Sequence, residues 1–337
     1  MLRVCLGKWL ITVFVAMVIM CVAPEACFAK SFTVGFMASG TALDDDSFNG
    51  MTVAGLRKLQ KEHDLKVEVH EGGFSSETIL EGLNHLVERN SDIIVINTST
   101  NYDVVLTFIK KHPELFFIIN DIGVDGYPNV SSIVFGQRMG SYLVGALCGW
   151  QTATGKVGFI GGNENPVIMD FLCGFKQGLK ASGRDIDLDV KFVRSGSSEK
   201  GFEDPRQANV LARCMYESGV DIIYAVAGLS GNGIIDAAAK TGNFVVGVDS
   251  DQDYMAKGTV LTSMMKRLDV AVYKEVLSVL NGEFVPGIKV YDLSNGGVGL
   301  TDMKYSRHLI SEEILKNLKK LKDRLASGEI DLKCSDY

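Results

Sequence analysis

Two acidic motifs, each placed after an apolar segment, carry the side chains most suited to binding a polar small molecule. The first is LDDDSFNG, residues 43–50, and the second is GVDSDQ, residues 247–252. The apolar runs 32–37 and 244–248 before them predict buried strands. In open α/β sheets ligands bind beyond the carboxyl ends of the strands, so both motifs are expected to face a ligand. Carboxylates together with the ring of Phe48 suit a planar molecule that bears hydroxyl groups.

Other chemistry-bearing patterns in the sequence are weaker. GNGIID, residues 231–236, lacks the third glycine of a dinucleotide-binding fingerprint and lies late in the chain. The triplet at 44–46 lacks the spaced oxygen ligands of a calcium loop, so it is interpreted as charge at a helix N-terminus. The five histidines are scattered, and none stands in a nucleophile–base motif. We therefore expect no cofactor, no metal and no catalytic residue.

The elements that must position these motifs alternate regularly from residue 31 onward. The predicted strands are 32–37, 66–69, 93–96, 116–119, 133–135, 156–160, 190–193, 222–226, 244–248, 260–262 and 289–293. The predicted helices are 49–63, 76–88, 102–111, 142–150, 167–179, 207–216, 233–239, 269–280 and 314–325. Such alternation is typical of parallel sheets with helices on both faces.

The alternation restarts after residue 135, which predicts an α/β protein of two lobes joined by a multi-strand hinge. The division assigns residues 30–136 and about 265–292 to an N-terminal lobe, 137–264 and about 293–310 to a C-terminal lobe, and 311–337 to a final helix and tail. Only six prolines occur and no low-complexity linker is present. We therefore expect the lobes to lie in close contact, with a ligand in the cleft between them.

The N-terminal residues predict export from the cytoplasm. Arg3 and Lys8 form a basic start, residues 9–22 are almost wholly apolar, and Cys27 and Ala29 are small residues at positions −3 and −1 of a cleavage site after Ala29. This pattern is typical of a secretory signal peptide, here residues 1–29. The apolar run of about 14 residues is short for a membrane span of about 20. A periplasmic or extracytoplasmic protein is expected, with a retained anchor or lipid attachment as the alternative.

Charge excludes one class of partner. The chain has 34 basic and 41 acidic residues, a net charge of −7, whereas nucleic-acid binding needs a basic surface. No polybasic segment is present that would hold the chain on a membrane surface. We therefore expect contact with a membrane only through a transporter or an anchor.

Four cysteines follow the predicted signal peptide: Cys148, Cys173, Cys214 and Cys334. None has the spacing of a metal site. The first three lie in apolar helical patterns, so buried free thiols are expected. One disulfide is the alternative in an oxidising compartment, and the sequence shows no pairing.

Several segments occur in the order typical of one protein family. They are DDDSFNG with the following GLRKL, then FLCGFKQGLK, AGLSGNGIIDAAAK, GVDSDQ and TSMMKRLDVAVY. On these motifs the chain, from about residue 32 to 328, resembles the basic membrane protein (BMP) family of purine nucleoside receptor-like, substrate-binding proteins of ABC transporters. The resemblance implies a type I periplasmic-binding-protein fold, a nucleoside ligand and ABC permease subunits as partners.

The resemblance also implies roles for five side chains. Phe48 would stack on the base, and Asp249 would accept hydrogen bonds from ribose hydroxyls. Lys266 would face the sugar and pair with Asp249. Asp121 would contact the base or the hinge. Asn49 would either reach the ligand or cap its helix.

Other positions depart from the family pattern or are proposed from the residues alone. Ser39 stands where the family commonly has an aspartate near the base, and a hydroxyl brings no charge, so the base preference stays open. Asn97 and Thr98 replace a more apolar turn and could add polar contacts. Gly228 begins a loop whose backbone amides could face the ligand. Phe171 is the candidate for a second stacking ring.

Three alternatives stay open at this point. The ligand could be a free nucleobase, a sugar or a furanose-like signal molecule. The protein could be a nucleoside-processing enzyme, which would need a metal-holding carboxylate cluster or an acid–base pair. It could also be a receptor ectodomain that transmits lobe closure to a sensor without import.

Overall fold

Two six-stranded sheets organise the chain, and the computed structural model describes residues 31–40, 42–98 and 101–334. The first sheet, in the order β11-β5-β4-β3-β1-β2, contains β1 (Phe32–Ala38), β2 (Leu65–Glu71), β3 (Ile93–Asn97), β4 (Phe116–Asn120), β5 (Val130–Phe135) and β11 (Gly287–Tyr291). The second, in the order β12-β10-β9-β8-β6-β7, contains β6 (Lys156–Gly161), β7 (Asp187–Phe192), β8 (Ile222–Val226), β9 (Phe244–Asp249), β10 (Val260–Lys266) and β12 (Val298–Leu300). Neighbouring strands are parallel except for the antiparallel pair β10 and β12.

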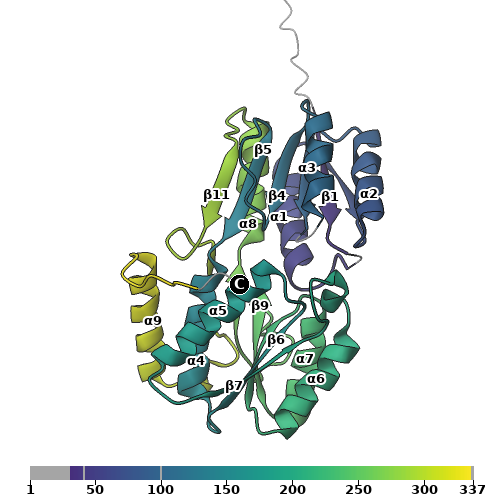
Figure 1. The fold of residues 1–337 in the computed structure, drawn as a ribbon. Coiled ribbons are helices and arrows are strands. Elements are labelled where there is room, and N and C mark those ends of the chain that lie inside the picture. The colour runs from purple at the N-terminus through teal and green to yellow at the C-terminus, as the bar shows by residue number, and fades with distance from the viewer. Residues whose placement is uncertain (1–30, 41, 99–100, 335–337) are drawn as a thin grey trace, which may run out of the picture. The chain divides into compact units, whose positions relative to one another are not determined.

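Helices cover both sheets, so the predicted α/β fold is confirmed (Figure 1). The helices connected with the first sheet are α1 (Phe48–Glu62), α2 (Ser76–Glu88), α3 (Tyr102–Lys111) and α8 (Leu268–Leu280). Those connected with the second are α4 (Gln137–Gln151), α5 (Pro166–Ala181), α6 (Pro205–Glu217), α7 (Ser230–Thr241) and α9 (Glu312–Ala326). Two short 3₁₀ helices, η1 (Glu199–Phe202) and η2 (Arg307–Leu309), complete the described elements.

The core forms because each strand sends alternate side chains to opposite faces of its sheet. In β1, Val34 and Phe36 pack in one cluster with Leu56 of α1, whereas Met37 packs in another with Leu83 of α2. Of the helices that cover the second sheet, α4 packs against α5, and α6 packs against α7. Helices on both faces bury the strands completely, which is why β3 and β8 contain only buried residues.

The chain passes from one sheet to the other three times. It crosses between β5 and α4, between β10 and α8, and between β11 and β12. We call the part built on the first sheet the N-terminal lobe and the part built on the second sheet the C-terminal lobe. Three crossing segments confine the relative motion of two lobes to a hinge, as in other ligand-closing proteins.

Several predicted boundaries were wrong. Helix α4 begins at Gln137, five residues before the predicted start, because the polar Gln137 and Ser141 are buried rather than exposed. Strand β10 continues to Lys266 instead of ending at residue 262, and strand β12 was not predicted. Sequence patterns underestimate such strands because serine, lysine and glycine have low strand propensity, which burial in a sheet overrides.

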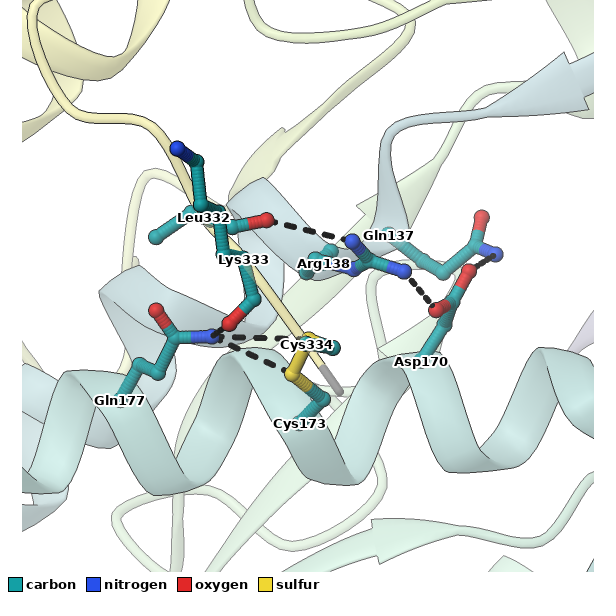
Figure 2. The surroundings of a disulfide bond; sticks show 8 residues. All are labelled: Gln137, Arg138, Asp170, Cys173, Gln177, Leu332, Lys333 and Cys334. Carbon is teal, nitrogen blue, oxygen red and sulfur yellow. Dashed lines mark hydrogen bonds and ion pairs between the residues drawn. A yellow bond between two sulfur atoms is a disulfide. The ribbon is translucent and has the colours of Figure 1, made fainter. Parts of the chain in front are cut away.

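Two of the expectations for cysteine were wrong. Cys173 of α5 forms a disulfide with Cys334 near the C-terminus (Figure 2). The two residues are 161 positions apart, and no local pattern relates them. Cys214 is exposed on α6 rather than buried, whereas Cys148 is a buried free thiol as predicted.

The predicted signal peptide, residues 1–29, lies outside the described residues. Among the helices that the structure does describe, each is too short or too polar to cross a membrane.

Candidate functional site

A cavity lies between the lobes, where β1, β4, β8, β9 and β10 end. It encloses about 710 Å³ of space not filled by protein atoms, its opening included. Both acidic sequence motifs contribute to the lining of this cavity. The first does so through Asp45, Phe48 and Asn49, and the second through Asp249.

A buried carboxylate fixes the first motif at the start of α1. The two carboxylate oxygens of Asp45 accept hydrogen bonds from the backbone N–H groups of Ser47 (2.8 Å), Asn49 (3.0 Å) and Gly50 (2.9 Å). Burial raises the pKa of Asp45, and these three N–H groups oppose the rise. The carboxylate thus satisfies helix-start donors and holds Phe48 in the first turn, where its ring lines the cavity.

Asn49 lines the cavity, but its side-chain amide forms hydrogen bonds within the protein. Its Nδ2 atom donates to the carbonyl oxygens of Ser39 (2.8 Å) and Ala42 (2.9 Å), while its Oδ1 accepts from Nδ2 of Asn97 (3.0 Å). These bonds tie the loop after β1 to α1. A direct contact of Asn49 with the ligand stays a prediction, and its observed contacts shape the wall that carries Ser39.

Lys266, at the end of β10, is the cationic side chain of the cavity. It is only 1% exposed and forms an ion pair of 2.5 Å with Asp121, which follows β4 in the other lobe. Its ammonium also lies 4.9 Å from the ring centre of Phe48, 5.1 Å from that of Phe135 and 5.7 Å from that of Phe171. Aromatic faces and a carboxylate therefore hold this charge in a buried position.

The predicted pairing of Lys266 with Asp249 was wrong, because Asp121 occupies the ion-pair position. Asp249 instead accepts a hydrogen bond of 2.5 Å from the Ser47 hydroxyl of the N-terminal lobe. Its burial raises its pKa to about 6, while the nearby Lys266 charge and the Ser47 hydroxyl oppose the rise. The carboxylate is thus ionised above about pH 6 and stands ready to accept hydrogen bonds from a ligand.

Asp121 and Asp249 share an unusual backbone conformation. Both have left-handed backbones, with φ of 70° and 66°; Asp121 directly follows β4, and Asp249 is the last residue of β9. Non-glycine residues rarely adopt such angles, and they persist where the surrounding fold imposes them, often at functional sites. Here the turn at each strand end aims a carboxylate into the cavity.

Several cavity residues escaped the sequence analysis, among them Phe74, Glu199, Phe202 and Glu203. Phe202 lies in η1, and a Cβ atom at Gly162 would lie 2.4 Å from its ring, so the ring is seated on a glycine. A lone aromatic residue in the polar stretch 194–204 was the available signal. Phe74 stands, like Phe48, between a strand end and a helix start.

The remaining predicted residues divide into two groups. Ser39, Phe171 and Gly228 line the cavity. Asn97 and Thr98 do not: they line a smaller adjoining pocket, and Asn97 accepts a hydrogen bond of 2.7 Å from Nδ2 of Asn120. Within the described residues no group of three or more histidine, cysteine or acidic side chains could hold a metal ion.

The charge of the cavity is strongly acidic. Its described lining contains one cationic side chain, Lys266, and five carboxylates, those of Asp45, Asp121, Glu199, Glu203 and Asp249. Such a surface favours a ligand rich in hydrogen-bond donors and disfavours an anion.

Two α/β lobes with an acidic, ring-lined cavity between them are typical of a solute-binding protein. The sequence model of the Bmp family, described as ABC transporter substrate-binding protein PnrA-like, matches residues 32–336. The chain belongs to this family, as its sequence motifs predicted. None of the relatives and structural neighbours named below is described as an enzyme.

Known proteins resemble the chain over most of its length. A CD4+ T-cell-stimulating antigen of Listeria monocytogenes is 32% identical over 324 residues, covering 90% of this chain and 88% of the relative. Basic membrane protein A of Borreliella burgdorferi is 29% identical over 304 residues, covering 88% and 86%. An ABC transporter solute-binding protein of Aeropyrum pernix has a TM-score of 0.78 at 25% identity, covering 89% and 92%.

Proposed function

We propose that this substrate-binding protein acts outside the cytoplasm and binds a nucleoside, a purine nucleoside in the first instance, for delivery to the permease subunits of an ABC importer. The single observation that supports this most strongly is the pairing of rings and carboxylates in one cavity. Phe48 and Phe202 line the same space as Asp249 and Lys266. A nucleoside has a planar base and a hydroxyl-rich sugar joined in one molecule.

The aromatic lining suits the base. A base stacked on an aromatic ring gains about 1–3 kcal/mol, and the face of any base can take part. Phe48 comes from the N-terminal lobe and Phe202 from the C-terminal lobe, so each lobe contributes a ring. Phe171, which we predicted as the second ring, also lines the cavity, with its ring centre 5.7 Å from the Lys266 ammonium.

The polar end of the cavity suits the sugar. A carboxylate can accept two hydrogen bonds, and charge-assisted bonds are the stronger kind. Asp249 and Lys266 both come from the C-terminal lobe, and Asp121 meets Lys266 from the N-terminal lobe. Ligand hydroxyls here would contact groups of both lobes, which favours lobe closure on binding. Binding and release need no covalent step.

A binding screen tests this proposal. The mature chain, taken as residues 30–337, is unfolded and refolded to remove carried ligand, then assayed against purine and pyrimidine nucleosides, free bases and sugars. A ligand at 100 times its Kd should add about 2.7 kcal/mol to the free energy of unfolding. We expect the largest thermal shift with a purine nucleoside.

The variant Phe48→Ala should weaken that binding by about 1–3 kcal/mol, or roughly 5- to 150-fold, because the base loses its stacking surface. Phe284→Ala is the matched control: Phe284 packs on Phe116 with ring centres 4.9 Å apart, away from the cavity lining. Thermal shifts confined to bases or sugars would replace the nucleoside by that ligand class. Equal affinities in both variants would remove Phe48 from the site.

A further inference from the structure

We propose that Tyr254 and Asp46 form a latch that holds the two lobes closed from outside the ligand cavity and controls the rate of ligand release. Asp46 belongs to the loop between β1 and α1, and Tyr254 to the loop between β9 and β10. Their contact therefore joins the two lobes. Its ligand-release test rests on the proposed function, and a second test below does not.

Three hydrogen bonds meet at Asp46. The Tyr254 hydroxyl donates to its carboxylate at 2.6 Å. The backbone oxygen of Asp46 accepts from Nε2 of Gln252 at 3.0 Å and from the hydroxyl of Ser250. None of these four residues lines the cavity, and Tyr254 is 52% exposed. The bonds therefore close the lobes without touching the ligand.

Each of the two loops holds its contact residue, Asp46 or Gln252, in a fixed conformation. Asp46 has a left-handed backbone with φ of 50°, an angle that non-glycine residues seldom adopt. On the opposite loop Gln252 is almost fully buried, and its Oε1 atom accepts the backbone N–H of Val248 at 3.0 Å. This bond fixes the amide that reaches across to Asp46. The latch thus joins two preorganised loops rather than two mobile side chains.

The latch lies directly beside the ligand-binding carboxylate. Ser47, the next residue after Asp46, donates to Asp249 at 2.5 Å across the same boundary. Opening of the latch would separate these two groups as well. Because the latch bonds exist only in the closed arrangement, they shift the equilibrium toward closure by their own free energy. The shift is the same for every ligand, since no ligand atom takes part.

Removal of one hydroxyl tests the latch. Tyr254→Phe should raise the dissociation rate constant of every bound ligand by the same factor, about three- to tenfold for a solvent-exposed hydrogen bond to a carboxylate. Stopped-flow release of two ligands with different bases measures this. Asp46→Asn should have a smaller effect in the Tyr254→Phe background than in the parent, because it weakens the same hydrogen bond that Tyr254→Phe removes.

Tyr273→Phe is a matched control. The Tyr273 hydroxyl donates to Glu62 at 2.6 Å, the same bond at the same length, but α8 and α1 both belong to the N-terminal lobe. This variant should release ligand at the parent rate. Equal release from Tyr254→Phe and Tyr273→Phe would overturn the latch, and so would an effect of Tyr254→Phe on one ligand alone.

A ligand-free measurement separates failure of the latch from failure of the nucleoside proposal. Amide hydrogen exchange reports transient opening of the lobes. In ligand-free protein, Tyr254→Phe should speed exchange in peptides covering residues 43–50 and 247–254, whereas Tyr273→Phe should not. If both variants exchange like the parent, the latch is wrong whatever the ligand is.

Discussion

At the scale of single residues, the burial of the Asp249 carboxylate lowers the stability of the fold at neutral pH. Its side chain is 6% exposed, and burial raises its pKa to about 6 although Lys266 and Ser47 oppose the rise. An unfolded chain would ionise this carboxyl near its ordinary pKa of about 3.9. At neutral pH the fold therefore holds a negative charge that water would solvate better, ready for the hydrogen-bond donors of a ligand.

The pH dependence of this effect gives a prediction. Because the folded pKa is the higher one, the stability that Asp249 contributes is complete below about pH 4 and is lost as the pH rises through about 6. Asp249→Asn removes the titration while its amide oxygen can still accept from Ser47. The variant should be more stable than the parent by about 2–3 kcal/mol at pH 8, and equal to it near pH 3.5.

Urea unfolding of both proteins at the two pH values measures the gap. A constant gap would mean that the substitution acts through packing and not through ionisation. The same variant should lose ligand affinity by about 1.5–3 kcal/mol, the scale of a hydrogen bond to a charged group. Asp253→Asn is the control for binding: its carboxyl pKa is also raised to about 6 by burial, but it does not line the cavity, so affinity should stay unchanged.

At the scale of elements, hydrophobic pattern predicted most of the fold. Helices α2 and α3 and strand β8 have the predicted boundaries, because their apolar residues repeat with the period of one element and clear caps or breakers follow. The missed strand β12 has only three residues, one of them glycine, and such a segment carries no periodic signal.

Side-chain partners were harder to predict than elements. Periodicity shows which face of an element is buried but not which residue from another element meets it. Lys266 and Asp121 lie 145 positions apart and meet because two lobes close on each other. The ring of Phe74 comes from a loop and that of Phe202 from the short helix η1; neither segment has a periodic pattern, so only the folded chain places these rings at the cavity.

The C-terminal tail braces helix α5 (Figure 2). Besides the disulfide from Cys173, Nε2 of Gln177 donates to the carbonyl oxygen of Lys333 at 3.2 Å. Arg138, close to the first crossing between the lobes, donates to the carbonyl oxygen of Leu332 at 3.2 Å and pairs with Asp170 of α5. The tail therefore ties the cavity-lining helix to the hinge.

Loss of the disulfide should destabilise the fold. Cys334→Ser is expected to lower the free energy of unfolding by about 2–4 kcal/mol, because the unfolded chain loses a cross-link that closes a long loop. Urea unfolding without reductant measures the change. Cys214→Ser alters an exposed free thiol and should leave stability unchanged. If a reducing agent lowers the stability of the parent but not of Cys334→Ser, the effect belongs to this bond; equal stability of both variants would contradict the prediction.

At the scale of the whole molecule, two negative fields act on a ligand. The chain has a net charge of −7, and the cavity adds five carboxylates against one amine among its described lining residues. The two fields differ in their response to salt. Charges exposed on the surface are screened beyond about 8 Å at physiological ionic strength, whereas buried charges are screened much less.

This difference gives a prediction about ligand selection. A purine nucleoside 5′-monophosphate, with a charge near −2 at pH 7, should bind about 100-fold or more weakly than the nucleoside itself, since buried like charges repel strongly. Isothermal titration of both ligands measures the ratio, and a neutral 5′-methylthio analogue controls for the added bulk. If the cavity carboxylates cause the discrimination, it should persist at 0.5 M salt. Collapse of the ratio in high salt would assign it to the surface charge, and equal weakness of the neutral analogue would assign it to the size of the cavity.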